Sequence, residues 1–469
     1  MKRQVVIVHG YSDKGESAKE WCRRLSAAGY DASQIHVADY VTLSNEITIK
    51  DLSEAFDRAV RLKPNLNQSQ PFDAIVHSTG MLVVRSWLST YQARRNRLKH
   101  LIGLAPATWG SPLADQGRSL LGAVFKGSHH LGPDFMEQGD RVLAALELGS
   151  SFTWDLAHKD LVTDTPVYGP DGDTPYPFIF VGLKDYGFIK SLVTESLGTD
   201  GTVRWAGVGF NCRRIEMDLS IDPASGKGPR VSYRPWKNTN VPMVLLRNHN
   251  HGTIFTAPDD DLVEAVTAAL QVETADQYAA WKSKYEDKTL HEARQAGITP
   301  WQQFIIHLID ERSDGISDYY VDLYTKNGDT WMPLEQFAPD VHAFSDDPSY
   351  RCFHVNIAPF AHDNGAQPKV TNLWLRLIAS SGTKLVAYFG YGTERITDDG
   401  LPVLNSGKWD AAIDLTPHLQ QTVASGDVKL FYPFTTTLVE IRMNREPMPL
   451  GINREPDVFK LLAPPSEPD

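Results

Sequence analysis

The chain has 469 residues, a formal net charge of −12 at pH 7, 42% hydrophobic residues and 22% charged residues. These values are ordinary for a globular protein, so they exclude a collagen, a coiled coil and a largely disordered chain. The acidic balance disfavours a nucleic-acid-binding protein, which usually presents a basic face. The length predicts two domains or three.

The beginning of the chain is typical of a first strand rather than a leader. Residues Met1–Val8 join two basic residues to an apolar run, but the run stops at His9 and no cleavage site follows. No apolar run approaches the roughly 20 residues that span a bilayer. The three cysteines, Cys22, Cys212 and Cys352, are widely spaced, which disfavours a disulfide framework or a zinc site. We expect a cytoplasmic protein, with export by a leaderless route left open.

The first half of the chain alternates apolar runs with amphipathic stretches. We expect buried strands at Gln4–Val8, Gln34–Ala38, Phe72–Val76, Leu101–Leu104, Pro177–Leu183 and Val241–Leu246. Helices are expected at Lys19–Ala28, Ile49–Leu62 and Met81–Arg94. Alternation at this spacing predicts βαβ units and a mostly parallel sheet.

The alternation breaks down over about residues 106–174 and does not return after the helical residues 259–296. The first break is typical of a lid-like insertion, with helices that only cover one edge as the alternative. Short strands are expected at Phe304–Ile309, Tyr319–Tyr324, Arg351–Ile357, Leu373–Ile378, Leu385–Tyr391, Ala411–Leu415 and Val428–Phe434. Their number and turn signals predict an antiparallel β-sandwich.

A serine stands where the third expected strand passes directly into a helix, in the run His77-Ser78-Thr79-Gly80. This arrangement is typical of a nucleophile elbow, which lifts the serine Oγ above the sheet. The usual pattern is G-x-S-x-G, and Val76 replaces the first glycine. The alternative interpretation is an ordinary strand end with a helix-capping serine.

Candidates for the other two members of a triad follow later strands. A serine nucleophile needs a histidine base, and the base needs an acid that orients it. Asp185 and Asp200 follow the fifth expected strand, and His249 and His251 follow the sixth. The order serine, acid, histidine is the order of α/β-hydrolases.

Five segments in the correct order resemble bacterial lipases of the α/β-hydrolase superfamily. They are His9-Gly10, the His77–Gly80 elbow, Ala105–Pro112, Asp200–Val203 and His251–Ile254. The resemblance covers roughly residues 1–270 and leaves out the C-terminal half. It implies an α/β-hydrolase fold and the hydrolysis of carboxylic esters through an acyl-enzyme.

The resemblance also implies a role for each matching residue. Ser78 is the expected nucleophile, His251 the base and Asp200 the acid. Asp185 is the runner-up acid and His249 the runner-up base.

Two backbone N–H groups are the expected oxyanion donors. They belong to Thr79, which follows the nucleophile, and to Tyr11 in the loop after the first strand. This chemistry calls for no cofactor.

The complete expected architecture has four parts. Residues 1–272 form the α/β-hydrolase catalytic domain with its insertion, 273–298 a helical connector, 299–463 a β-sandwich accessory domain and 464–469 a disordered tail.

His129 and His130 in the insertion are interpreted as surface residues, and no metal is expected. Two interpretations of the C-terminal Trp301, Trp331, Trp374 and Trp409 stay open: contact with a lipid surface or a partner protein, and packing in the sandwich core.

Three hypotheses on function follow. The first is a serine lipase or phospholipase that takes a lipid or another ester. The second is an acyltransferase on the same triad, with an alcohol as acceptor. The third is an inactive hydrolase fold that binds lipid or protein. Loss of activity would account for Val76 in place of the first glycine of the elbow motif.

Overall fold

The computed structural model describes most of the chain. The described residues are 4–8, 18–35, 46–62, 70–91, 96–114, 140–164, 166–170, 175–184, 198–227, 231–234, 240–335, 337, 339–358, 370, 372–383, 385–391, 408–419, 422–423, 426–427 and 430–447. Residues 115–139 of the expected insertion and the expected tail 464–469 lie outside them.

The first sheet contains six described strands, all parallel, in the order β2-β1-β3-β4-β5-β8. The strands are β1 (Gln4–Val8), β2 (Asp31–Ile35), β3 (Phe72–His77), β4 (Leu98–Leu104), β5 (Tyr176–Gly182) and β8 (Met243–Leu246). The apolar runs of β1, β5 and β8 have no polar alternation, which is typical of strands that helices cover on both faces.

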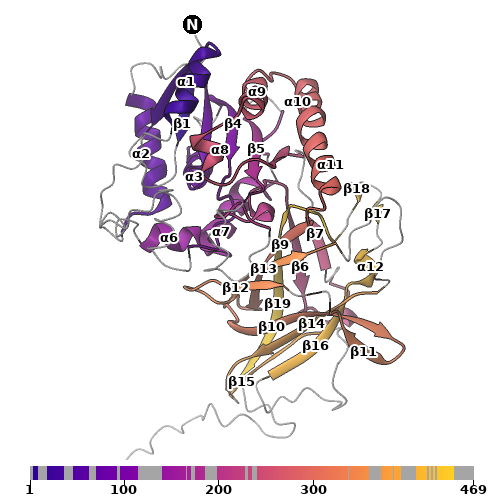
Figure 1. Ribbon diagram of the computed structural model, residues 1–469. Helices are drawn as coiled ribbons and strands as arrows, with labels where there is room; N and C mark the ends of the chain where they lie inside the picture. The colour runs from indigo at the N-terminus through magenta and orange to yellow at the C-terminus, as the bar shows by residue number, and fades with distance from the viewer. Residues whose placement is uncertain are drawn as a thin grey trace, which may run out of the picture.

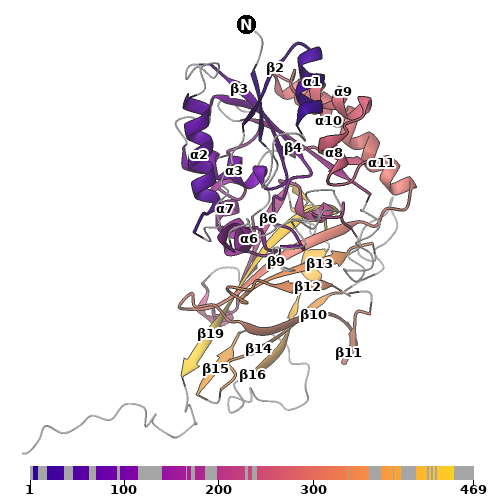
Figure 2. The same cartoon turned by 60° about the vertical axis from the view of Figure 1, so that its left-hand side comes forward.

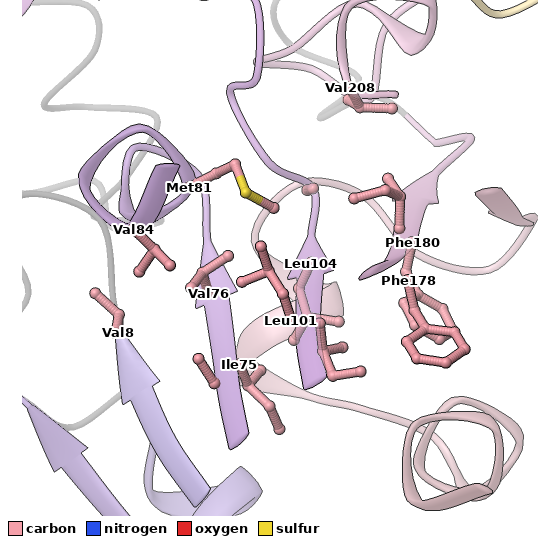
Figure 3. Close-up of a cluster of buried hydrophobic side chains, with 14 of the residues drawn as sticks. Val8, Ile75, Val76, Met81, Val84, Leu101, Leu104, Phe178, Phe180 and Val208 are labelled. Atoms are coloured by element: carbon pink, nitrogen blue, oxygen red, sulfur yellow. The ribbon is translucent and has the colours of Figure 1, made fainter. Parts of the chain in front are cut away.

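Helices cover the two faces of this sheet (Figure 2). On one face lie α2 (Ile49–Leu62), α3 (Gly80–Thr90) and α7 (Ser151–Asp160), with the short α6 (Asp140–Leu146) below them. On the other face lie α1 (Lys19–Ala27), α8 (Thr253–Thr256), α9 (Asp260–Ala269), α10 (Ala275–Lys282) and α11 (Lys288–Gln295). Figure 3 shows how Met81 and Val84 of α3 face Val8, Val76 and Leu104 of the sheet.

The C-terminal residues form two further main sheets beneath the first (Figure 1). A four-stranded antiparallel sheet has the order β11-β10-β14-β16, with β11 (Thr330–Pro333), β10 (Asp318–Asn327), β14 (Trp374–Ser380) and β16 (Lys408–Asp414). The larger sheet has the order β12-β13-β9-β19-β6-β7, and β15 also pairs with β19. Its strands are β12 (Asp340–Ala343), β13 (Tyr350–Asn356), β9 (Trp301–Asp310), β19 (Thr436–Pro447), β6 (Cys212–Asp218), β7 (Val231–Arg234) and β15 (Val386–Phe389).

The expected fold class is confirmed, with differences in the larger sheet. That sheet is mixed rather than antiparallel, because β19 runs parallel to both β9 and β6. The strand expected at Val428–Phe434 is wrong: the described residues 430–435 are not a strand, and the strand begins at Thr436. The second strand begins at Asp31, before the expected Gln34, and residues 36–38 of the expected range lie outside the described residues.

Two strands connect the first half of the chain to the C-terminal sheets. β6 and β7 lie inside the range 1–272, yet they pair with each other and, through β6, with β19. The carboxyl ends of the first sheet's strands point toward this larger sheet (Figures 1 and 2). The boundaries at 272, 298 and 463 stay predictions.

A separate apolar cluster joins the two parts. It contains Trp109, Leu148, Trp154, Ala157, Cys212, Ile305, Phe344, Tyr350, Cys352 and Leu438. Burial raises the pKa of the Cys352 thiol to about 11, so this cysteine is a neutral packing residue. Glu147 adds a polar contact, since one carboxylate oxygen lies 2.7 Å from His342 Nε2 and accepts from the Ser345 hydroxyl at 2.6 Å. Burial acts to raise the pKa of Glu147, but these hydrogen bonds hold it below its ordinary value.

The C-terminal tryptophans divide between core and surface. Trp301 and Trp409 are buried, whereas Trp331 and Trp374 are half-buried, with the Lys326 ammonium over both rings. No helix among the residues that the structure describes is long and apolar enough to cross a bilayer.

The α3–α7 contact contains a fully buried ion pair. Arg85 Nε and Nη2 donate to the two carboxylate oxygens of Asp160 at 2.8 and 2.9 Å, and neither side chain is exposed. The Tyr168 hydroxyl also donates to Asp160. Removal of one charge from such a pair leaves the other charge buried and uncompensated.

We therefore expect Asp160→Asn to lower the free energy of unfolding by about 3–5 kcal/mol. Urea denaturation followed by tryptophan fluorescence measures this change. The matched control is Glu54→Gln, which breaks the exposed pair with Arg58 on α2 and should leave stability unchanged. Equal effects of the two substitutions would contradict this account of the buried pair.

Candidate active site

The turn between β3 and α3 has the geometry of a nucleophile elbow. Ser78 has φ of 53°, a left-handed conformation that is strained for a residue with a side chain. Its N–H donates to Leu104 O at 3.4 Å and its carbonyl accepts from the Ala107 N–H at 3.1 Å, so the strained residue is held from β4. Within the described residues, Ser78 Oγ has no hydrogen-bond partner.

Small residues make room for this turn on two sides. A Cβ on Gly80 would lie 2.7 Å from the carbonyl oxygen of Val8, so β1 and α3 can approach closely only with glycine there. Val76, which replaces the first glycine of the usual motif, stands opposite Gly103 on β4. A Cβ on Gly103 would lie 2.7 Å from Met81 Cε, so the glycine lets β4 pack closely against the first turn of α3.

The acid and base candidates favoured by the sequence lie in contact. His251 Nδ1 lies 3.0 Å from Asp200 Oδ2, and both side chains are buried. The other carboxylate oxygen of Asp200 accepts from the N–H groups of Thr202 at 2.9 Å and Val203 at 2.8 Å. The backbone N–H of His251 donates to the Asp200 carbonyl at 3.1 Å, which joins the two loops a second time.

His77 links this pair to the elbow. Its Nε2 donates to the backbone carbonyl of His251 at 2.9 Å, and the two imidazole rings are 4.8 Å apart. The other side of the His77 ring stacks on Phe255, with centroids 4.7 Å apart. The residue next to Ser78 therefore packs against the histidine paired with Asp200.

The runner-up histidine has a different acidic neighbour. His249 Nε2 lies 3.0 Å from Oδ2 of Asp259, the residue that caps α9. The acid beside His249 is therefore Asp259 rather than Asp200. Asp185 and Tyr11 lie outside the described residues. Thr79 occupies the N-cap position of α3, where the first backbone amides of a helix have no partner within the helix.

The segment 105–112 supports the residues around Asp200. Ser111 Oγ donates to Thr202 O at 2.6 Å, and Thr108 Oγ1 donates to Val208 O at 2.7 Å. Gly110 has φ of 91°, and a Cβ there would lie 2.5 Å from a carbonyl oxygen of Leu146. This segment thus contacts the loop that carries Asp200 from the side of β4.

Among the residues described, no three His, Cys, Asp or Glu side chains gather in a way that could hold a metal ion. His129 and His130 lie outside them.

No protein-family model matches the chain, and no curated protein matches it either. Two solved structures of phospholipase PlaB from Legionella pneumophila do match over the whole chain. The structure in complex with thio-NAD is 22% identical, covers 100% of this chain and 98% of its own, and has a TM-score of 0.74. The second structure is 21% identical, has the same coverage and gives a TM-score of 0.75.

The chain has the fold of a lipase-like α/β-hydrolase. The likeness extends through the C-terminal sheets, which the sequence resemblance did not cover.

Three polar residues of this fold were not identified as candidates from the sequence. His77 was only part of the elbow motif, and Glu147 and Arg204 carried no motif at all. Their partners are backbone atoms or lie more than 100 residues away, so no local pattern marks them.

The close contact of Gly80 with Val8 yields a stability prediction. Gly80→Ala should cost about 1–3 kcal/mol, because the added Cβ meets backbone atoms that cannot rotate away. Gly209→Ala is the matched control, since its nearest neighbour would be 3.5 Å from the Cβ, an ordinary contact. Thermal unfolding of both variants measures the difference, and equal melting temperatures would contradict the close packing of the elbow.

Proposed function

We propose that the chain is a serine carboxylic-ester hydrolase of the lipase or phospholipase kind, with Ser78, His251 and Asp200 as its triad. The observation that carries this proposal is the buried Asp200–His251 contact, held by His77 beside the strained Ser78. In the nucleophile elbow of α/β-hydrolases, the serine lies on a strained turn between a strand and a helix, and Ser78 has a left-handed backbone conformation at such a turn. The PlaB neighbours, which are phospholipases, support the same class of reaction.

The proposal gives each group a step in the reaction. His251 Nε2 takes the proton of Ser78 while Oγ attacks the ester carbonyl carbon. Asp200 accepts from the imidazole Nδ1–H, which fixes the tautomer and stabilises the imidazolium. The Thr79 N–H and the Tyr11 N–H are the proposed donors to the oxyanion.

The remaining steps return the enzyme to its starting state. The tetrahedral intermediate collapses as the imidazolium protonates the departing alcohol, and an acyl group stays on Ser78. His251 next takes a proton from a water that attacks the acyl carbonyl, and it gives that proton to Ser78 Oγ as the ester bond to the serine breaks and the acid leaves. An alcohol in place of water would make the protein an acyltransferase, so competition between water and glycerol distinguishes the two outcomes.

A lipid ester is the proposed substrate. Because the net charge is −12, attachment to a lipid surface would depend on local side chains rather than on overall charge. Tyr320 is exposed on the four-stranded sheet, on the face that carries the half-buried Trp331 and Trp374, and it is a candidate for such contact. The cytoplasmic location stays a prediction.

The triad is tested with single substitutions and a soluble short-chain ester. Ser78→Ala and His251→Asn should each lower kcat by about 10⁴- to 10⁶-fold, because each removes the nucleophile or its base. His249→Asn, the matched control, should keep kcat within about threefold of the wild type, since this histidine faces Asp259. A fully active Ser78→Ala variant, or a wild type without activity on any ester, would contradict the proposal.

A further inference from the structure

The proposed acid lies at the tip of a short closed loop. We call residues 198–205 the acid loop. Thr199 and Arg204 form an isolated antiparallel bridge, and the Trp205 N–H donates to Gly198 O at 2.8 Å. The Asp200 N–H donates to Val203 O at 3.2 Å within this frame. The position of Asp200 therefore depends on what holds the two ends of the loop.

One end is held by an ion pair to the C-terminal sheet. The Arg204 side chain is 2% exposed, and its Nη2 pairs with the carboxylate of Asp340, the first residue of β12. Its Nη1 lies 3.6 Å from Cys352 Sγ on β13. A buried guanidinium is tolerated only when a counter-charge compensates its lost hydration.

His354, which lies near Arg204, adds no second positive charge there. Burial and the charge of Arg204 hold the pKa of His354 well below its ordinary value, so its ring is neutral. Its ring stacks on Trp301, with centroids 4.4 Å apart. The carboxylate that the structure pairs with Arg204 is that of Asp340.

The other end of the acid loop rests on an aromatic ring. Gly198 has φ of 84°, and a Cβ there would lie 2.6 Å from Trp301 Cδ1 at the start of β9. Just beyond the loop, Thr436 Oγ1 of β19 donates to the Ala206 carbonyl at 2.9 Å. Four strands of the C-terminal sheet, β12, β13, β9 and β19, thus contact the loop or the residue that follows it.

We propose that Arg204 and Asp340 are positioning residues for the ester hydrolysis: through them, β12 of the C-terminal sheet holds Asp200 in line with His251. The inference rests on the proposed function and extends it to the second half of the chain. Neither residue is part of the triad, and each acts through the acid loop. A displacement of about 1 Å in a catalytic group can cost about 10²-fold in rate, so a loose acid loop would lower the chemical step.

The test uses variants of Asp340 in the full chain. The Asp340 side chain is 54% exposed, so its substitution alters the surface rather than the core. Asp340→Ala removes the counter-charge, Asp340→Asn removes only the charge, and Asp340→Glu restores it. Asp318→Ala, an exposed carboxylate on β10 of the other sheet, is the matched control. Active sites are counted with a fluorophosphonate probe, so that misfolded protein lowers the site count and not kcat per site.

We expect kcat per titrated site to fall about 10- to 100-fold in Asp340→Ala and by less in Asp340→Asn, with KM for a short-chain ester unchanged. Asp340→Glu should recover most of the rate, and Asp318→Ala should equal the wild type. Wild-type kcat per site in Asp340→Ala, with Ser78→Ala inactive, would overturn the positioning role and leave the proposed function intact. A wild type that neither hydrolyses esters nor reacts with the probe would overturn both.

Discussion

The fully buried carboxylate of Asp200 is the constraint on which the rest of the site depends. A charge removed from water must be compensated by hydrogen bonds or by an opposite charge. Asp200 obtains this from two backbone N–H groups of its own loop and from the His251 ring. The loop must therefore stay closed, and the segment 105–112 and the C-terminal sheet both pack around it. In this view the long second half of the chain helps to hold the loop that carries Asp200.

The parallel sheet and the elbow could be predicted because their signals are local. An apolar run of four residues without polar alternation indicates a strand buried on both faces, and Val5–Val8 has this pattern. The strand-to-helix switch at Ser78 is marked by a change from unbroken apolar residues to helical spacing within a few positions. The preference for Asp200 and His251 came from the resemblance to lipases, and the two side chains are in contact.

The parts that could not be predicted depend on partners far away in the sequence. β6 was not recognised as a strand of the C-terminal sheet because it pairs with β19, more than 200 residues later. In the sequence, nothing distinguishes Arg204 from an ordinary surface cation. Its burial and its ion pair with Asp340 are what suggest the proposed positioning role.

The central claim is that Ser78 is a nucleophile activated by His251. The most direct measurement is peptide mass spectrometry of the wild-type chain after reaction with a fluorophosphonate. The account predicts one phosphonyl adduct, located on Ser78, that forms much more slowly in His251→Asn and at the wild-type rate in His249→Asn. An adduct on a different serine, or an unmodified Ser78 at saturating probe, would contradict it.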